Sequence, residues 1–336
     1  MKRLSKLIGI TVVLLLVFGI SSVYAQDTIN AGDVVTGTLT AESEGMPYVI
    51  SLSAGEIISV ALDSDAFDAY MYIYDAAGTE LLSEDYGGEG NNVVVNFFAP
   101  ANGDYTILAR GWSSSAAGDY TLSVTGIVAD ELAYNTPFNA SIENEIVHYF
   151  TFKGAEGDVL NIFVDSGDQD VDMDLTLYDL SGAELASNSD GGSGVDPALV
   201  RVMLPASGLY IVEMSSWFDE PATGVLTTTI ETTDLLQLDD GPITLNIGER
   251  FEYDVVRFTG VTNGLYRIHL VSPGSPITAN ATIDLGDWTE INLHIEGALQ
   301  GTMDFYAPHD GWVDVVVEPG FWSDGMTVEV SIKTME

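Results

Sequence analysis

The sequence predicts an all-β protein, built from three tandem antiparallel jelly-roll or β-sandwich modules that follow a signal peptide. Three observations lead to this prediction. Apolar residues recur with a period of two, related segments repeat about 104 residues apart, and no window has the 3.6-residue period of a long amphipathic helix. Because 46% of the residues are apolar, the chain can bury large cores, which excludes an intrinsically disordered protein.

The first 25 residues have the pattern of a secretory signal peptide. A basic start, Lys2 to Lys6, precedes the apolar run Leu7 to Ile20, and Val23-Tyr24-Ala25 forms a small-residue cleavage site. The apolar run is too short to span a bilayer comfortably. We therefore expect a secreted protein, extracellular or periplasmic, with no membrane insertion after the signal has been cleaved.

An internal repeat sets the predicted domain organisation. Residues 66–83 read AFDAYMYIYDAAGTELLS, and residues 170–187 read DVDMDLTLYDLSGAELAS. A weaker third copy is centred on the turn Pro308–Gly311. The sequence therefore predicts the following regions: a signal peptide over 1–25, module 1 over 27–128, module 2 over 132–231 and a divergent module 3 over 236–336.

Strands are expected where apolar and polar residues alternate between clusters of Gly, Asn, Asp and Ser. In module 1, Ala69, Met71 and Ile73 alternate with three tyrosines, and the matching segment of module 2 alternates in the same way. This period places one face of each strand in a core. The strands expected in module 1 cover 34–40, 48–53, 57–63, 67–74, 93–98, 104–110 and 120–125.

Two motifs carry a family resemblance. Module 2 has an Asp-x-Asp-x-x-Leu-Tyr-Asp strand with a turn glycine over Asp172–Gly182, and a Pro-Ala-Ser-Gly-x-Tyr turn over Pro205–Tyr210. Module 1 has the counterparts Asp68–Gly78 and Pro100–Tyr105, whereas module 3 lacks the paired aspartates. Together these elements resemble the bacterial pre-peptidase C-terminal domain.

The resemblance implies a secreted jelly-roll β-sandwich of the kind commonly appended to extracellular peptidases. Some related modules bind calcium or polymers such as collagen or polysaccharide. No peptidase domain accompanies the modules in this sequence, so the family's usual context is missing.

The sequence lacks the motifs of the common catalytic classes. It has no Cys, and it has no Gly-x-Ser-x-Gly, His-Glu-x-x-His or Gly-x-x-x-x-Gly-Lys motif. The four histidines do not recur in register between the repeats. We therefore expect no enzymatic activity and no catalytic residue. The less favoured alternative is a hydrolase with an unrecognised carboxylate pair among the 51 acidic residues.

A run of aspartates is the candidate metal site. Asp168, Asp170, Asp172 and Asp174 have a spacing of two, which on a strand places them on one face about 6 to 7 Å apart. Calcium takes six to eight oxygen ligands and is the cation we expect there. Asp68 is the module 1 counterpart of Asp172. The alternative is an acidic face that binds only solvent.

Three tryptophans are the candidate ligand contacts. Trp112, Trp217 and Trp322 recur just after corresponding strands, and Trp112 continues the parity of the polar positions of its strand. An indole on the wetter face can stack on a sugar ring or anchor a protein partner. The alternative is an indole that folds back and caps the edge of the sandwich.

The charge of the chain narrows the class of partner. With 10 Lys plus Arg against 51 Asp plus Glu, the formal net charge is −41, which disfavours nucleic acid and anionic membranes. The leading hypothesis is a secreted, non-catalytic protein that binds an extracellular polysaccharide, a cell-surface component or a protein partner, with calcium as a candidate stabilising ion. The alternative is a structural or solubilising acidic protein without a specific ligand.

Overall fold

The computed structural model shows an all-β chain, as the alternation predicts. It describes residues 27–167, 171–192, 195–216, 221–234, 241–247, 253–284, 290–319 and 326–335. The regular elements within these ranges are all strands. In the same ranges, no helix has the length and apolar character that crossing a bilayer requires.

The strands fall into three sets, which we call modules 1, 2 and 3. Module 1 contains β1 (Asp27–Thr28), β2 (Val34–Leu39), β3 (Met46–Leu52), β4 (Ile57–Asp63), β5 (Ala69–Tyr74), β6 (Glu80–Glu84), β7 (Val93–Phe98), β8 (Gly103–Gly111) and β9 (Gly118–Ile127). Module 2 contains β10 (Asp130–Glu131), β11 (Phe138–Glu145), β12 (Val147–Gly154), β13 (Val159–Asp165), β14 (Met173–Asp179), β15 (Glu184–Asn188), β16 (Ala198–Met203), β17 (Gly208–Ser216) and β18 (Ala222–Thr232). Module 3 contains β19 (Ile243–Ile247), β20 (Asp254–Gly260), β21 (Leu265–Val271), β22 (Ile277–Asp284), β23 (Glu290–Ala298), β24 (Gln300–Tyr306), β25 (Gly311–Pro319) and β26 (Met326–Thr334).

Each module is a sandwich of two sheets with the same strand order. The front sheets are β1-β3-β8-β5-β6, β10-β12-β17-β14-β15 and β20-β25-β22-β23, and the back sheets are β2-β9-β4-β7, β11-β18-β13-β16 and β19-β26-β21-β24. Apart from the two-residue strands β1 and β10, which pair in parallel with their neighbours, the three modules have one topology. Two four-stranded antiparallel layers in this order form a jelly roll, so the predicted fold is confirmed.

The cores lie between the two sheets of each module. In β5, Ala69, Met71 and Ile73 are fully buried, while the tyrosines between them are partly exposed. In β14, Met173 is likewise buried, with Leu175 and Leu177. The two-residue period therefore sorts the side chains as predicted, and each module has an apolar core of its own.

One turn explains the Pro-Ala-x-Gly-x-Tyr motif of modules 1 and 2. The Tyr105 hydroxyl donates to the carbonyl of Ala101 at 2.6 Å, and the Tyr210 hydroxyl donates to that of Ala206 at 2.5 Å. Each tyrosine lies at the start of a front-sheet strand and is buried. The motif thus ties the turn to the strand that follows it.

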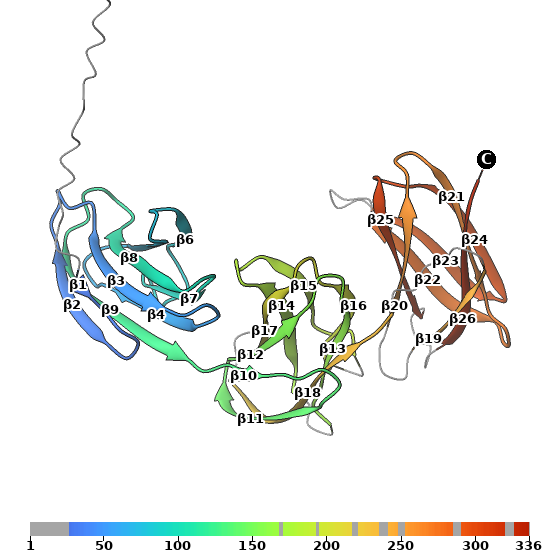
Figure 1. Cartoon of the computed structure of the whole chain (residues 1–336), viewed down its shortest axis with the longest axis horizontal. Coiled ribbons are helices and arrows are strands. Elements are labelled where there is room, and N and C mark those ends of the chain that lie inside the picture. The colour runs from blue at the N-terminus through green and yellow to red at the C-terminus, as the bar shows by residue number, and fades with distance from the viewer. Residues whose placement is uncertain are drawn as a thin grey trace, which may run out of the picture.

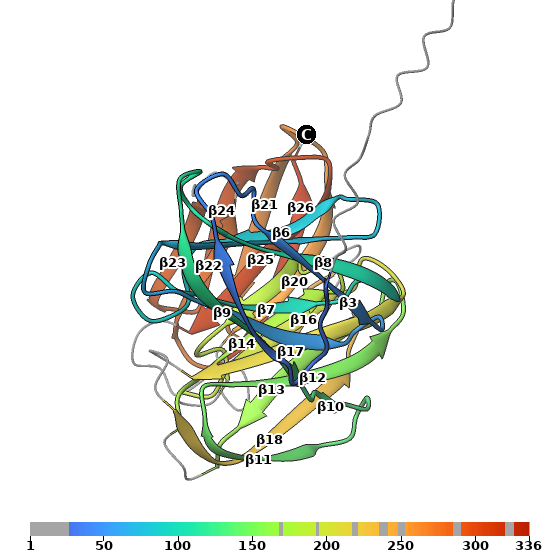
Figure 2. The same ribbon diagram turned by 90° about the vertical axis from the view of Figure 1, so that its left-hand side faces the viewer.

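The three modules lie in a row (Figure 1). Figure 2 gives the view along this row from the side of module 1. In Figure 1, β7 lies on the side of module 1 that faces module 2, and the lower end of β20 in module 3 lies toward module 2. The order of the modules along the chain is therefore also their order in space.

An apolar cluster joins modules 1 and 2. Its centre consists of Ile57 from the back sheet of module 1 and of Tyr149 and Ile211 from the outer face of the module 2 front sheet. These side chains are 1%, 2% and 0% exposed. Since the outer face of a sheet otherwise meets solvent, this burial shows that module 1 covers the front sheet of module 2.

The strand β7 makes the side-chain contacts across this first junction. The ring centroid of Phe98 lies 5.7 Å from that of Tyr149 and 5.6 Å from that of Tyr178. The side-chain amide of Asn96 donates to the Tyr149 hydroxyl at 2.8 Å. The junction therefore combines ring packing with a hydrogen bond to a buried hydroxyl.

A partly buried carboxyl group lies beside Tyr149 in the same junction. Glu213 pairs with Tyr149 across β12 and β17. Burial raises the pKa of Glu213, and a hydrogen bond from Tyr149 opposes that rise. Burial also raises the pKa of Tyr149, and it raises that of Tyr178 to about 12. Both phenols are therefore neutral at physiological pH.

Modules 2 and 3 meet through an ion pair. Arg201 of β16 donates from Nε to Asp254 of β20 at 2.7 Å and from Nη1 to the Thr233 hydroxyl at 3.0 Å. The Arg201 and Asp254 side chains are only 15% and 17% exposed. Arg201 also has a φ of 53°, a conformation uncommon outside glycine. Strand β16 is the counterpart of β7, and β20 is the counterpart of β12, so both junctions join the same pair of strands.

Candidate binding site

Trp112 lies on the solvent side of module 1, directly after β8. Its side chain is 59% exposed, and its backbone amide donates to the carbonyl of Asp68 at 2.9 Å. The indole meets the ring of Tyr70 edge to face, with centroids 5.2 Å apart. The exposed side predicted for Trp112 from strand parity is therefore observed, whereas its contact with a ligand stays a prediction.

A row of tyrosines continues from Trp112 along the outer face of β5. Tyr70 and Tyr72 meet edge to face at 4.8 Å between centroids, and Tyr72 stacks on Tyr74 at 5.6 Å. All three rings are partly exposed. The row extends away from Trp112, so an extended ligand could contact several rings at once.

Arg110 gives this row a positive charge. Its guanidinium carbon lies 5.7 Å from the ring centroid of Tyr72 and 6.0 Å from that of Tyr70. Arg110 is the first basic residue after the signal segment, in a chain with a formal net charge of −41. We call Trp112, Tyr70, Tyr72 and Arg110 the Trp112 cluster.

The hydroxyls beside Arg110 stay protonated. Burial is the main cause that raises the pKa of Tyr72 and of Tyr74. The face therefore presents neutral phenols, which donate and accept hydrogen bonds, beside one guanidinium that only donates. Such a surface suits a ligand with many hydroxyl or carbonyl groups.

The strand pattern already contained part of this site. Sequence reasoning singled out Trp112 and recognised the three tyrosines only as the outward-facing half of an alternation. The missed signal is three tyrosines at a spacing of two on one strand. Trp217 and Trp322, the other two predicted contacts, lie outside the described residues.

The predicted calcium ligands are only partly described. Asp168 and Asp170 lie outside the described residues. Asp174 is partly buried in β14, whereas Asp172 precedes this strand, which begins two residues later than the alternation from Val171 suggests. Asp68 is exposed. Among the described residues, no three His, Asp or Glu side chains come together as a metal site. The calcium site stays a prediction that depends on Asp168 and Asp170.

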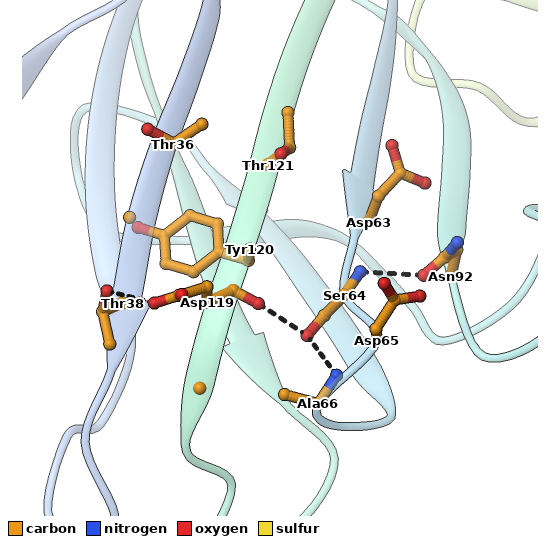
Figure 3. Close-up of a pocket in the computed structure, with 12 residues that line it drawn as sticks. Thr36, Thr38, Asp63, Ser64, Asp65, Ala66, Asn92, Asp119, Tyr120 and Thr121 are labelled. Atoms are coloured by element: carbon orange, nitrogen blue, oxygen red, sulfur yellow. Dashed lines mark hydrogen bonds between the residues drawn. The ribbon is translucent and has the colours of Figure 1, made fainter.

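Module 1 also has an open polar pocket at one end of its back sheet (Figure 3). Ser64 organises it, since its hydroxyl donates to the carbonyl of Asp119 at 2.8 Å and its amide donates to Asn92 at 2.9 Å. Thr38 donates to the Asp119 carboxylate at 2.6 Å. In Figure 3 the carboxylates of Asp63 and Asp65 lie on the other side of Ser64 from Asp119. These contacts tie the loop after β4 to its neighbours.

Two parts of the chain match a known family model. Residues 48–111 and residues 146–216 match the bacterial pre-peptidase C-terminal domain. These ranges contain most of β3 and all of β5 and β8 in module 1, and β12, β14 and β17 in module 2, all of them front-sheet strands. No curated protein matches the chain.

Solved structures show distant similarity. One is the pre-peptidase C-terminal domain of collagenase from Bacillus anthracis, at 16% identity and a TM-score of 0.27, over 30% of this chain and 94% of that one. PliG, a periplasmic inhibitor of g-type lysozyme from Aeromonas hydrophila, has 15% identity and a TM-score of 0.24, over 30% and 99%. The secreted serine protease VesC from Vibrio cholerae has 12% identity and a TM-score of 0.22, over 80% and 74%.

Proposed function

Because residues 48–111 and 146–216 are bacterial pre-peptidase C-terminal domains, we propose that this chain is a secreted, non-catalytic binding protein. Its ligand is an uncharged extracellular polymer, held by the Trp112 cluster. Domains of this family are generally non-catalytic accessory modules. The signal-peptide pattern of residues 1–25 supports export.

The row of rings is the observation that carries this proposal. Trp112, Tyr70 and Tyr72 present adjoining aromatic surfaces with centroids 4.8 to 5.2 Å apart, on a rigid antiparallel sheet. Aromatic side chains contribute large contact areas at a small entropic cost, because they have few rotatable bonds. An extended polymer gains from each successive ring, whereas a small solute contacts one or two.

The charge of the chain selects among polymers. A formal net charge of −41 repels anionic polysaccharides and nucleic acids at low salt. Arg110 supplies a local donor for neutral hydroxyl or carbonyl oxygens. A neutral polysaccharide therefore fits the face better than an anionic one, and collagen-like protein is the competing neutral-backbone ligand to include in the test.

Co-sedimentation with insoluble polymers tests the proposal. The mature chain is mixed with cellulose, chitin, insoluble collagen and an anionic polymer, and the bound fraction is measured. We expect retention on at least one uncharged polymer, and Trp112→Ala should weaken it about tenfold or more. The matched control is Tyr86→Ala, which removes a ring that is 70% exposed in the same module. The proposal fails if the wild type binds none of these polymers or if Trp112→Ala binds as well as the wild type.

Calcium stabilisation is a separate proposal for modules 1 and 2. A cation that binds only the folded state raises the melting temperature in a concentration-dependent way. We expect calcium to raise it more than sodium chloride at matched ionic strength, and Asp170→Asn to remove the difference. Equal shifts from calcium and sodium would show simple screening of the acidic surface and would reject the proposal.

A further inference from the structure

The outer end of module 3 has the same layout as the end of module 1 that covers module 2. In module 1, Ile57 of β4 pairs with Phe98 of β7 and with Ile127 of β9. In module 3, Leu265 of β21 pairs with Tyr306 of β24, and its carbonyl accepts a hydrogen bond from the Met335 amide at 2.8 Å. The second set is an apolar trio at the same three positions of the sheet, listed in the same order: Leu265, Tyr306 and Met335.

The two trios differ in what lies over them. Ile57 is 1% exposed and Phe98 is partly buried because module 2 packs against them, whereas Tyr306, the counterpart of Phe98, is 60% exposed. Leu265 and Met335 are also partly exposed. Module 3 therefore presents, uncovered, the kind of end that forms a junction elsewhere in this chain.

Module 1 has a partly exposed counterpart of the surface that is covered in module 2. In module 2 the end of module 1 covers Tyr149, Ile211 and Tyr178 on the front sheet. Their counterparts in the pairing register of module 1 are Pro47, Thr106 and Tyr74. We call Pro47, Thr106, Tyr74 and their neighbours Val49 and Leu108 the acceptor surface.

The acceptor surface is partly exposed and largely apolar. All five of its residues are partly exposed, and its one polar side chain besides the tyrosine is the threonine hydroxyl. It lies beside the Trp112 cluster, with Tyr72 stacked on Tyr74 at 5.6 Å. We call the trio Leu265, Tyr306 and Met335 of module 3 the donor end.

We propose that the module 3 end, centred on Tyr306, docks on the acceptor surface of module 1 in a second copy of the chain. The contact uses the same strand positions as the junction between modules 1 and 2, but without its hydrogen bond from Asn96 to Tyr149, since Pro47 has no hydroxyl. The same strands meet again where β16 contacts β20. A head-to-tail contact of this type leaves one donor end and one acceptor surface free in every open assembly. It therefore builds open linear chains rather than closed rings, unless the rotation at each contact happens to close.

Charge makes this association dependent on salt. Two copies with a formal net charge of −41 each repel one another, and salt screens that repulsion within a Debye length of about 10 Å at 0.1 M. The docked surfaces themselves are mostly apolar, so their attraction changes little with salt. Association should therefore strengthen as the salt concentration rises.

Light scattering and sedimentation of the mature chain test the proposal without any polymer, so its outcome is independent of polymer binding. We expect the weight-average mass to rise with protein concentration and to rise further at high salt. Tyr306→Asp and Thr106→Asp should each reduce the association constant about thirtyfold or more, because each places a charge at the centre of the contact. The matched control is Leu299→Asp, at the opposite end of β24, where the side chain is 52% exposed.

Mixing the two variants gives the sharpest result. Tyr306→Asp retains an intact acceptor surface, and Thr106→Asp retains an intact donor end, so an equimolar mixture should form heterodimers that grow no further. A wild type that stays monomeric at every concentration and salt level would overturn the proposal. The proposal would also be overturned if Tyr306→Asp associated as strongly as the wild type, or if the control Leu299→Asp associated as weakly as Tyr306→Asp is expected to.

Discussion

The front sheets of modules 1 and 2 have the same strand order and different surroundings. In module 2 the outward-facing Tyr149 and Ile211 are buried beneath module 1, whereas their counterparts Pro47 and Thr106 in module 1 are partly exposed. Strands β5 and β14 carry a tyrosine at the same position, but Tyr178 packs against Phe98, whereas Tyr74 stacks on Tyr72 of its own row.

The comparison shows that the role of a face in a tandem protein depends on what covers it. A covered face can carry large apolar residues such as Ile211 and can enclose an acid such as Glu213. An open face uses amphipathic rings, whose polar edges tolerate water while their faces remain available for contact. The same jelly roll thus supplies a junction in one module and a candidate binding surface in the other.

The largest expected effect comes from placing a charge in the covered face. Ile211→Asp should reduce the free energy of unfolding by about 4 kcal/mol, because it buries an unpaired carboxylate. The same substitution at the matching open position, Thr106→Asp, should change it by less than about 0.5 kcal/mol. Urea unfolding, monitored by hydrogen exchange in β12 and β17, measures the change in the free energy of unfolding for each variant. An equal loss of unfolding free energy in the two variants would mean that both faces are covered to the same extent.

The next effect compares the two junctions. Arg201→Ala removes charged hydrogen bonds to Asp254 and should cost about 2 kcal/mol, while Asn96→Ala removes one neutral bond to Tyr149 and should cost about 1 kcal/mol. Urea unfolding of each variant against the wild type measures both losses. If Asn96→Ala is the more damaging of the two, the order of strength assigned to the junctions is wrong.

The smallest effect concerns pH. Burial raises the pKa of Glu213 above its ordinary value of 4.5, so the folded state binds this proton more tightly than the unfolded chain does. The resulting stabilisation is complete below that ordinary value and is lost as the pH rises through the raised pKa of the folded state. Relative to the wild type, Glu213→Gln should therefore become progressively more stable as the pH rises above the ordinary value of 4.5 through the raised pKa of the folded state.

Urea unfolding of both proteins across that range measures the difference. The control is Glu156→Gln, which neutralises an exposed acid of the same module and should leave the pH profile unchanged. A constant offset between Glu213→Gln and the wild type would show that the proton on Glu213 is not linked to folding.

The alternation of apolar residues was enough to predict the fold. Strands β4 (Ile57–Asp63) and β7 (Val93–Phe98) have the expected bounds, and the other strands expected in module 1 differ by one or two residues at their ends. A period of two depends only on the neighbouring residues of one strand, so it can be recognised without knowing what the strand packs against.

The junctions could not be predicted in the same way. Tyr149 and Ile211 lie on the outer face of their sheet, and their burial comes from residues of another module, among them Ile57 and Phe98, which are more than 50 positions away. No local period records such a contact. Trp112 of the candidate site was predicted, because the alternation along its own strand shows on which face it lies. Arg110 was missed, because its position over two rings depends on the pairing of β5 with β8.

Hydroxyl-radical footprinting of the intact mature chain tests the central claim most directly. It measures, in one experiment, how fast Tyr74 and Tyr149 are oxidised on the two related faces. We expect Tyr74 to react several times faster than Tyr149, and we expect Ile211→Asp to bring Tyr149 close to the rate of Tyr74. Equal rates for the two tyrosines in the unmodified chain would contradict the claim that one face is covered and the other is open.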